Sequence, residues 1–310
     1  MKEYNRLKRF ALFFVNEKGY FCLNELIKNG KAEQIGFVVT YRQKLVREDY
    51  FDKIVSLCSE HGIQYFERKA FNNVKAGELF QEYRIRGCIA IGWQFLLPME
   101  WFKDLEDRLI VFHDSLLPKY RGFAPTPTAI LNGEKTLGVT ALYGEEGMDT
   151  GKIILQEKYE ITEGEYIGEI IRRQSKIYSK MLIAIMEMCL SGGITAYQQD
   201  ESQASYSVWR DLEDCRIDWS QSSEQINRLV HAVAAPYPGA FCYYEGKKIR
   251  INRSEVMPDI HFEIRYAGKI WKLIDGMPLV ICGNGMLKII EAESLEGERI
   301  IFKKVRSRFE

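Results

Sequence analysis

The sequence lacks any excess of charge of one sign. Lys and Arg together number 43, as do Asp and Glu, so the formal net charge is zero. The chain between Ser205 and Glu310 is balanced too, with 16 basic and 15 acidic residues. Proteins that grip nucleic acid usually carry a basic stripe. The balance leaves room for a local basic patch, but it favours a small-molecule partner over a nucleic acid.

Paired cysteines and long apolar runs are missing as well. The seven cysteines are odd in number and scattered, with no C-x-x-C, which disfavours a disulfide framework or a zinc site and predicts reduced thiols and no metal. A membrane-spanning helix needs about 20 apolar residues, and the first apolar run stops at Asn16-Glu17-Lys18. We therefore expect neither a signal peptide nor a membrane span, and a cytoplasmic protein.

Two catalytic or binding motifs are also absent. The turn after the apolar run Phe10–Val15 contains only Gly19, whereas a dinucleotide site requires G-x-G-x-x-G there. No G-x-S-x-G nucleophile elbow is present, which removes the hydrolases that use it. The sequence therefore remains compatible with a Rossmann-like fold, but an NAD or FAD site is not expected.

The first two hundred residues alternate between strand-like and helix-like segments. The expected strands are Phe10–Val15, Ile35–Thr40, Gln64–Glu67, Gly87–Gly92, Leu109–Phe112, Gly138–Tyr143 and Ile153–Ile161. The expected helices are Glu48–Cys58, Lys75–Tyr83, Pro98–Leu105 and a long one that a Thr162/Glu165 capping box opens. This alternation predicts an α/β fold with a Rossmann-like, mostly parallel sheet covered on both faces.

The pattern changes after the polar run Gln198–Gln203. Turn dipeptides follow at Glu245-Gly246, Asp275-Gly276 and Asn284-Gly285, and the last two are typical of hairpins. This part of the chain predicts a small antiparallel β-barrel, OB-like, or a curled sheet. We expect two domains, residues 1–203 and residues 204–310.

The candidate site is the stretch V-F-H-D-S-L-L-P-K-Y-R-G, from Val111 to Gly122. Its His113 ends an apolar run, and Asp149 follows between two glycines. An Asp beside a His can fix the tautomer of a proton-shuttling imidazole. Both residues follow predicted parallel strands, whose carboxyl ends share one edge of the sheet. The alternative is that His113 is a satisfied strand-end histidine and Asp149 a turn residue.

The stretch, with G-x-D-x-G after it, resembles the folate-dependent formyltransferases that act on methionyl-tRNA, sugar nucleotides or glycinamide ribonucleotide. Ala204–Ser207, Arg216–Trp219 and Pro236–Phe241 resemble the tail of the tRNA and sugar-nucleotide branches. The resemblance implies 10-formyl-tetrahydrofolate as co-substrate, with His113 and Asp149 as catalytic residues. Its implied folate-binding residues are Phe95, Leu96, Leu97, Ser115, Leu116, Leu117, Pro118, Glu145, Glu146, Gly147 and Met148. For Phe95–Leu97 the alternative is ordinary helix-start packing.

One departure concerns Val111, because the family carries an Asn there that donates a hydrogen bond to the developing oxyanion. Gln94, Thr126 and Thr128 are the polar residues nearby in sequence that could replace it. The tRNA branch also carries a basic insertion where this chain has only the short turn Tyr41–Arg47. Three readings follow: an N-formyltransferase for a small amine such as a nucleotide-linked amino sugar, a methionyl-tRNA formyltransferase, or a folate-binding homologue with altered catalysis. The oligomeric state is left open.

Overall fold

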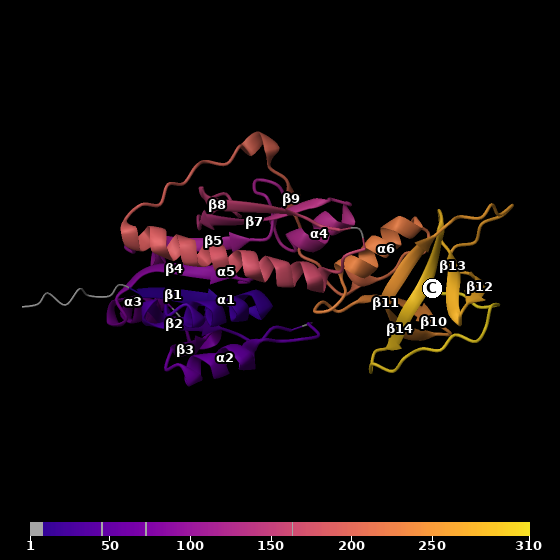
Figure 1. Cartoon of the computed structure of the whole chain (residues 1–310), viewed down its shortest axis with the longest axis horizontal. Helices are drawn as coiled ribbons and strands as arrows, with labels where there is room; N and C mark the ends of the chain where they lie inside the picture. The colour runs from indigo at the N-terminus through magenta and orange to yellow at the C-terminus, as the bar shows by residue number, and fades with distance from the viewer. Residues whose placement is uncertain (1–8, 45, 72, 163) are drawn as a thin grey trace, which may run out of the picture.

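The computed structural model describes residues 9–44, 46–71, 73–162 and 164–310. The basic start of the chain, residues 1–8, and Leu45 of the short turn lie outside the described residues. An α/β part and a β-rich part lie end to end along the long axis (Figure 1). In the described part, none of the helices is long and apolar enough to cross a membrane.

The α/β part is built on a seven-stranded sheet in the order β3-β2-β1-β4-β5-β7-β8. The first five strands in this order pair in parallel, whereas β7 is antiparallel to both β5 and β8. Their bounds are β1 (Arg9–Phe14), β2 (Ile35–Thr40), β3 (Gln64–Glu67), β4 (Ile85–Ile91), β5 (Arg108–His113), β7 (Thr136–Tyr143) and β8 (Ile153–Glu160). β1, β2 and β4 are apolar and almost wholly buried, as central parallel strands require. The predicted fold class is confirmed.

Helices cover both faces of this sheet. α1 (Asn16–Lys28), α2 (Phe51–Glu60) and α5 (Ile167–Ser191) share one apolar core with the strands, and α3 (Asn73–Glu82) belongs to the core on the other face. The predicted helix Pro98–Leu105 is wrong: only a 3₁₀ turn, Met99–Trp101, forms. Phe102, directly after this turn, is buried against the sheet, and the chain must then change direction to begin β5 at Arg108.

The long helix α5 begins later than the sequence predicted. Thr162 does bond to the Glu165 carboxylate, at 3.1 Å through its backbone N–H. The helix itself starts at Ile167, where the Tyr166 N–H donates to the Glu169 carboxylate at 3.1 Å. The apolar face of α5 is buried against the sheet and the C-terminal part, with Ile170 and Ile185 fully inside.

The C-terminal part is an antiparallel sheet in the order β10-β11-β14-β13-β12, with α6 (Ser223–Ala232) packed on it. Its strands are β10 (Ala240–Tyr244), β11 (Lys247–Met257), β12 (Ile270–Ile274), β13 (Met277–Ile281) and β14 (Met286–Ser294). Asp275 and Gly276 have φ of 55° and 77°, the pair of positive values that a tight hairpin turn requires. The last residues curl the sheet, because Phe309 N donates to Gly268 O and Glu310 N donates to Tyr243 O, both at 2.9 Å.

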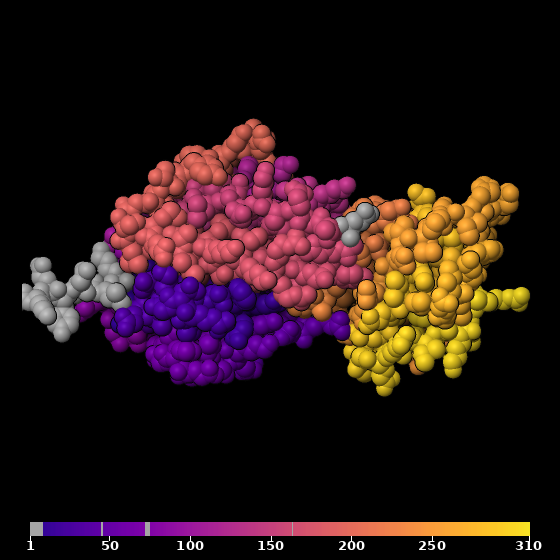
Figure 2. Space-filling view, in the orientation of Figure 1, coloured from indigo at the N-terminus to yellow at the C-terminus, as the bar shows by residue number. Residues whose placement is uncertain are grey.

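The two parts share one apolar core. Ile170 of α5, Ile130 of α4 (Pro125–Leu131), Val230 of α6 and Ile249 of β11 belong to the same buried cluster. In Figure 2 the C-terminal part, orange to yellow, lies directly against one end of the α/β part. The β-rich part is therefore packed onto the first turns of α5 and is more than a tethered appendage.

Candidate active site

His113 and Asp149 do meet, but by a different route from the one the sequence suggested. β7 runs antiparallel to β5, with Tyr143 opposite Ile110, so the loop after β7 starts at the far end of β5. The prediction that both residues follow parallel strands is therefore wrong. The loop folds back along β5 and brings Asp149 Oδ2 to 3.4 Å from His113 Nδ1.

The two ring nitrogens of His113 have different partners. Nε2 lies 2.8 Å from the carbonyl oxygen of Tyr120. A carbonyl only accepts, so this contact places a proton on Nε2. The Asp149 carboxylate also only accepts, so it can bond to Nδ1 when that nitrogen carries a proton. Asp149 Oδ2 is itself held by the backbone N–H of Gly122 at 2.8 Å. The ring is 7% exposed, so its orientation is fixed by the protein.

Both residues that flank the imidazole have strained backbone. Tyr120 has φ of 59° and Asp149 has φ of 52°, in the left-handed region that non-glycine residues rarely adopt. Such conformations cost of order 1–3 kcal/mol each and cluster at functional sites. The surrounding structure therefore holds two strained residues in place around one histidine.

The polar groups of the turn after β5 form hydrogen bonds within the protein. Ser115 Oγ donates to Lys119 O at 2.6 Å, and Thr140 Oγ1 donates to Ser115 O at 2.7 Å. Leu117 is buried, and Leu116 packs over Gly138 so closely that a Cβ there would collide with it. Ser115–Pro118 thus supports the strand end that carries His113, and its contact with folate stays a prediction.

The other predicted folate-binding residues are largely solvent-exposed. Leu96 is 90% exposed and Phe95 about half-exposed, while Leu97 packs on the core. Tyr41 packs edge-on against Phe95 with ring centroids 5.0 Å apart, and Arg68 lies over the same ring. The loop before Asp149 is exposed over Glu145, Glu146, Gly147 and Met148. Exposed apolar side chains leave these loops open to a ligand, and their role stays a prediction.

Val111 lies two residues before His113 on the same strand and therefore on the same face of the sheet. It packs against an apolar cluster of Leu117, Leu142 and Ile153 and offers no donor. Two of the proposed replacements donate elsewhere: Thr128 Oγ1 donates to Ala124 O at 2.8 Å, and Thr126 Oγ1 donates to Asp114 O at 3.4 Å. Gln94 is exposed and accepts a hydrogen bond from Tyr41.

A buried ionic group, which the sequence pattern did not lead us to predict, lies next to His113. Asp114 pairs with Lys18 of α1 and accepts a hydrogen bond from the Tyr178 hydroxyl of α5. Burial alone would raise the pKa of Asp114, but the Lys18 charge and the bonds from Lys18 and Tyr178 outweigh it and lower that pKa. A lysine on the buried face of an apolar helix was the available signal.

Arg121, near the end of the candidate stretch, is buried completely. It belongs to β6 (Arg121–Gly122), which pairs with β9 (Tyr206–Ser207). Its guanidinium forms an ion pair with Glu201 at 2.6 Å and donates to Gln199 at 2.8 Å. Arg121 therefore has a structural role: it links the β6 segment to Gln199 and Glu201.

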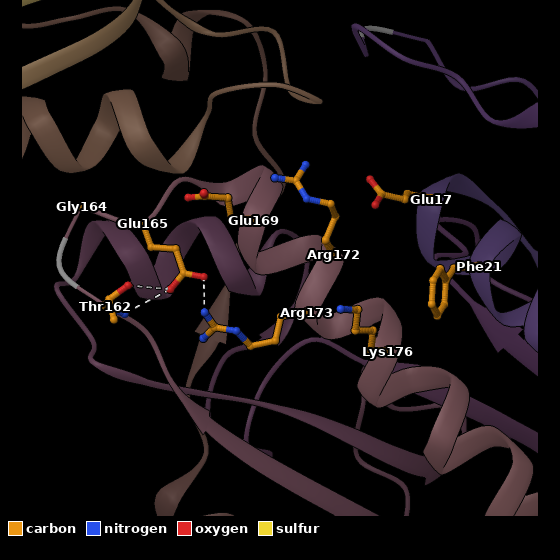
Figure 3. Close-up of a pocket in the computed structure, with 9 residues that line it drawn as sticks. All are labelled: Glu17, Phe21, Thr162, Gly164, Glu165, Glu169, Arg172, Arg173 and Lys176. Carbon is orange, nitrogen blue, oxygen red and sulfur yellow. Dashed lines mark hydrogen bonds and ion pairs between the residues drawn. The ribbon is translucent and has the colours of Figure 1, made fainter.

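A cavity of about 790 Å³ lies elsewhere on the molecule, between α1, α5 and the loop that precedes α5 (Figure 3). Arg173 is paired with Glu165, while Arg172 and Lys176 project from the same face of α5 (Figure 3). Neither His113 nor Asp149 lines it. Over the described ranges, no group of three or more His, Cys, Asp or Glu is placed to hold a metal ion.

A His–Asp pair beside a mostly parallel sheet, joined to a curled β domain, is an arrangement that can carry general acid–base chemistry. Residues 9–186 match the family described as Formyl transferase, and residues 211–305 match Formyl transferase, C-terminal domain. The chain belongs to the formyl transferase family, and membership supports transferase activity. The resemblance seen in the sequence is confirmed. The predicted domain boundary, 203/204, lies between the two matched segments and stays a prediction.

Relatives with established names agree with this family. The methionyl-tRNA formyltransferase of Protochlamydia amoebophila is 34% identical over 78% of this chain and 76% of its own length. That of Caldanaerobacter subterraneus is 28% identical over 91% of this chain and 87% of its own length. These similarities extend over both parts of the structure.

Solved structures share the fold at lower identity. The N-formyltransferase from Helicobacter canadensis, in complex with folinic acid and dTDP-3-aminofucose, has a TM-score of 0.68 at 16% identity, covering 94% of this chain and all of that one. HypX from Aquifex aeolicus has a TM-score of 0.63 at 17% identity over 93% of this chain. The chain spans less than half, 44%, of that HypX chain.

Proposed function

We propose that this protein transfers a formyl group from 10-formyl-tetrahydrofolate to the primary amine of a small acceptor, a nucleotide-linked amino sugar. The observation that carries the chemistry is the His113 pair: Nε2 bound to Tyr120 O, and Nδ1 facing Asp149 at 3.4 Å. The structural neighbours bound to folinic acid or tetrahydrofolate support the choice of donor. The seven unpaired, buried cysteines support a cytoplasmic location as part of the proposal.

In this proposal His113 handles both proton steps through Nδ1. The acceptor amine attacks the formyl carbon and forms the new C–N bond, and its proton passes to Nδ1. Asp149 stabilises the imidazolium that results. The same proton then passes to the folate nitrogen as its C–N bond to the formyl group breaks, which releases tetrahydrofolate. General acid–base catalysis of this kind contributes about 10²–10⁴-fold.

The ion pairs of the arginines in the short turn after β2 support a small acceptor. Arg42 is paired with Asp52 and lies within 3.7 Å of Asp49, and Arg47 is paired with Glu293 of the C-terminal part. The N–H of Arg47 also bonds to Pro236 O at 2.9 Å. These arginines are neutralised by the protein itself and pin the turn to the C-terminal part, so they are poor anchors for the phosphates of a tRNA acceptor stem.

Methionyl-tRNA is the second candidate acceptor, because the relatives described above are methionyl-tRNA formyltransferases. The two acceptors differ in how strongly they depend on phosphate contacts. Binding of tRNA weakens steeply with salt, by about 10³–10⁵-fold between 50 and 200 mM for 6–10 contacts. A nucleotide sugar, with two phosphates, depends on salt far less.

The test incubates the purified protein with 10-formyl-tetrahydrofolate and either amino-sugar nucleotides or initiator methionyl-tRNA. We expect a formylated sugar nucleotide by mass spectrometry and no gel shift with the tRNA. Tight, salt-sensitive binding of the tRNA, with formylation of its methionine, would instead identify methionyl-tRNA as the acceptor. Folate binding by calorimetry without turnover of any amine would support the third reading, a homologue altered at Val111. The absence of folate binding would sink the proposal.

A further inference from the structure

The segment Gln199–Ser207 runs from the polar stretch that ends the predicted first domain into the predicted second one, and it contacts Tyr120, whose carbonyl is bonded to Nε2 of His113. The backbone N–H of Tyr120 donates to Ser205 Oγ at 3.0 Å, and Ser207 Oγ donates to Tyr120 O at 3.3 Å. That carbonyl is the one bonded to Nε2 of His113. The strained Tyr120 is therefore held at both its N–H and its C=O from this one segment.

The same segment also holds the loop of Asp149, on the Nδ1 side of the imidazole. The side-chain amide of Gln199 donates to Asp149 O at 2.7 Å and to Gly151 O at 2.8 Å. Its oxygen accepts two bonds from the Arg121 guanidinium, at 2.8 and 3.2 Å. Arg121 is paired in turn with Glu201. All the hydrogen-bonding capacity of the buried Gln199 amide is thus used to tie the Asp149 loop to the β6 segment.

We infer that Gln199–Ser207 is a positioning element of the active site, with Gln199 and Ser205 as its positioning residues. Two left-handed residues, Tyr120 and Asp149, would relax without external restraint. Relaxation of either would move an oxygen away from one ring nitrogen of His113. Because about 1 Å of misplacement can cost 10²-fold in rate, these contacts set turnover without touching a substrate. The inference rests on the proposed function, in which His113 carries the protons.

The test compares Gln199→Glu with the neighbouring Gln198→Glu, which makes the same change at an exposed position. A carboxylate at 199 keeps its bonds to Arg121 but repels the carbonyl oxygens of Asp149 and Gly151. We expect Gln199→Glu to lower kcat about 10- to 100-fold with little change in KM, and Gln198→Glu to behave as the parent. Ser205→Ala, which removes only one hydroxyl, should lower kcat in the same direction and serves if Gln199→Glu folds poorly.

A second readout needs no turnover. The protein has four histidines, so the His113 imidazole signal can be assigned by its loss in His113→Gln, and its NMR titration followed in each variant. We expect Gln199→Glu and Ser205→Ala to shift that titration and the pH profile of kcat, and Gln198→Glu to shift neither. Variants that only lower the unfolding temperature, with kcat and the His113 titration of the parent, would overturn the inference. If His113→Gln is as active as the parent, the proposed function fails instead, and the titration still decides the positioning.

Discussion

His113 and Asp114 are adjacent in the chain, yet their side chains project in opposite directions from the end of β5. His113 faces the loop of Asp149, whereas Asp114 pairs with Lys18 between α1 and α5. The alternation of side chains along an extended strand produces this division. One residue is placed for chemistry, and the next anchors the strand end to the helices that cover the sheet.

The His113–Asp149 pair should behave as one unit. We expect His113→Gln and Asp149→Asn each to lower kcat/KM by about 10²–10⁴-fold, because each removes part of a single proton-transfer device. The double variant should be little worse than the more damaging single one. A kinetic double-mutant cycle measures this, and losses that multiply fully would show that the two residues act independently.

The resemblance predicts an oxyanion donor at position 111, where this chain has Val, and a substitute for that donor can be sought at Trp93. Its indole N–H is buried without a hydrogen-bond partner among the described residues, just after β4, the strand paired with β5. We expect Trp93→Phe to lower kcat by up to about 10²-fold, since loss of one oxyanion donor costs about 10²–10³-fold. Val111→Asn should restore activity in that background and change the parent little.

Two outcomes would contradict this view. If the parent is inert towards every amine and Val111→Asn alone gains activity, the protein in its natural form is a folate-binding homologue. If Trp93→Phe keeps the parental kcat, Trp93 is not the donor. Folding of each variant is checked by its thermal unfolding, because Trp93 packs edge-on against Phe13 at 5.2 Å.

The buried pair of Asp114 and Lys18 should matter strongly for stability. Asp114→Asn leaves the Lys18 ammonium, whose side chain is 7% exposed, without its counter-charge. Breaking a buried pair in this way costs about 3–5 kcal/mol, measurable by urea unfolding. The pair of Lys31 and Glu187, whose glutamate side chain is 60% exposed, is the control, and Glu187→Gln should cost less than about 1 kcal/mol. Equal losses at the two sites would show that Lys18 is hydrated despite its burial.

His231 should make stability depend on pH. It is buried against Tyr166, with ring centroids 4.2 Å apart, and burial, with a smaller effect from Arg253, lowers the pKa of His231 from 6.5 to about 4. Between these values the unfolded chain binds the proton and the folded chain does not, so stability falls as the pH drops from about 6.5 towards 4. The loss should be on the order of 2 kcal/mol.

His231→Gln isolates this contribution. The difference in unfolding free energy between parent and variant should change across that pH range, because other titrating groups cancel. A difference that stays constant from pH 7 to 4.5 would show that His231 is protonated in the folded state or hydrated. The site chemistry should be unaffected, since His231 belongs to α6 in the C-terminal part.

The sequence by itself determined the strands, most helices and the hairpins. Strands such as Ile35–Thr40 are recognisable because a fully buried parallel strand must be continuously apolar, and Asp275-Gly276 because a two-residue turn requires positive φ. The motif around His113 identified the family for a similar reason: its information lies within a few consecutive residues. Where local pattern was weak, as at Pro98–Leu105, the helix prediction was wrong.

Only the tertiary structure decided the direction of β7, the partners of Asp114 and the role of Gln199. Strand direction depends on how a loop closes against distant packing, and alternating apolar residues look the same in either direction. Lys18 and Asp114 are 96 residues apart, and Gln199 and Asp149 are 50 apart. Contacts of this kind arise from where the folded chain places its segments, because no local periodicity specifies which buried polar group meets another. The residues of the site could therefore be predicted from the sequence, whereas their geometry depends on the tertiary structure.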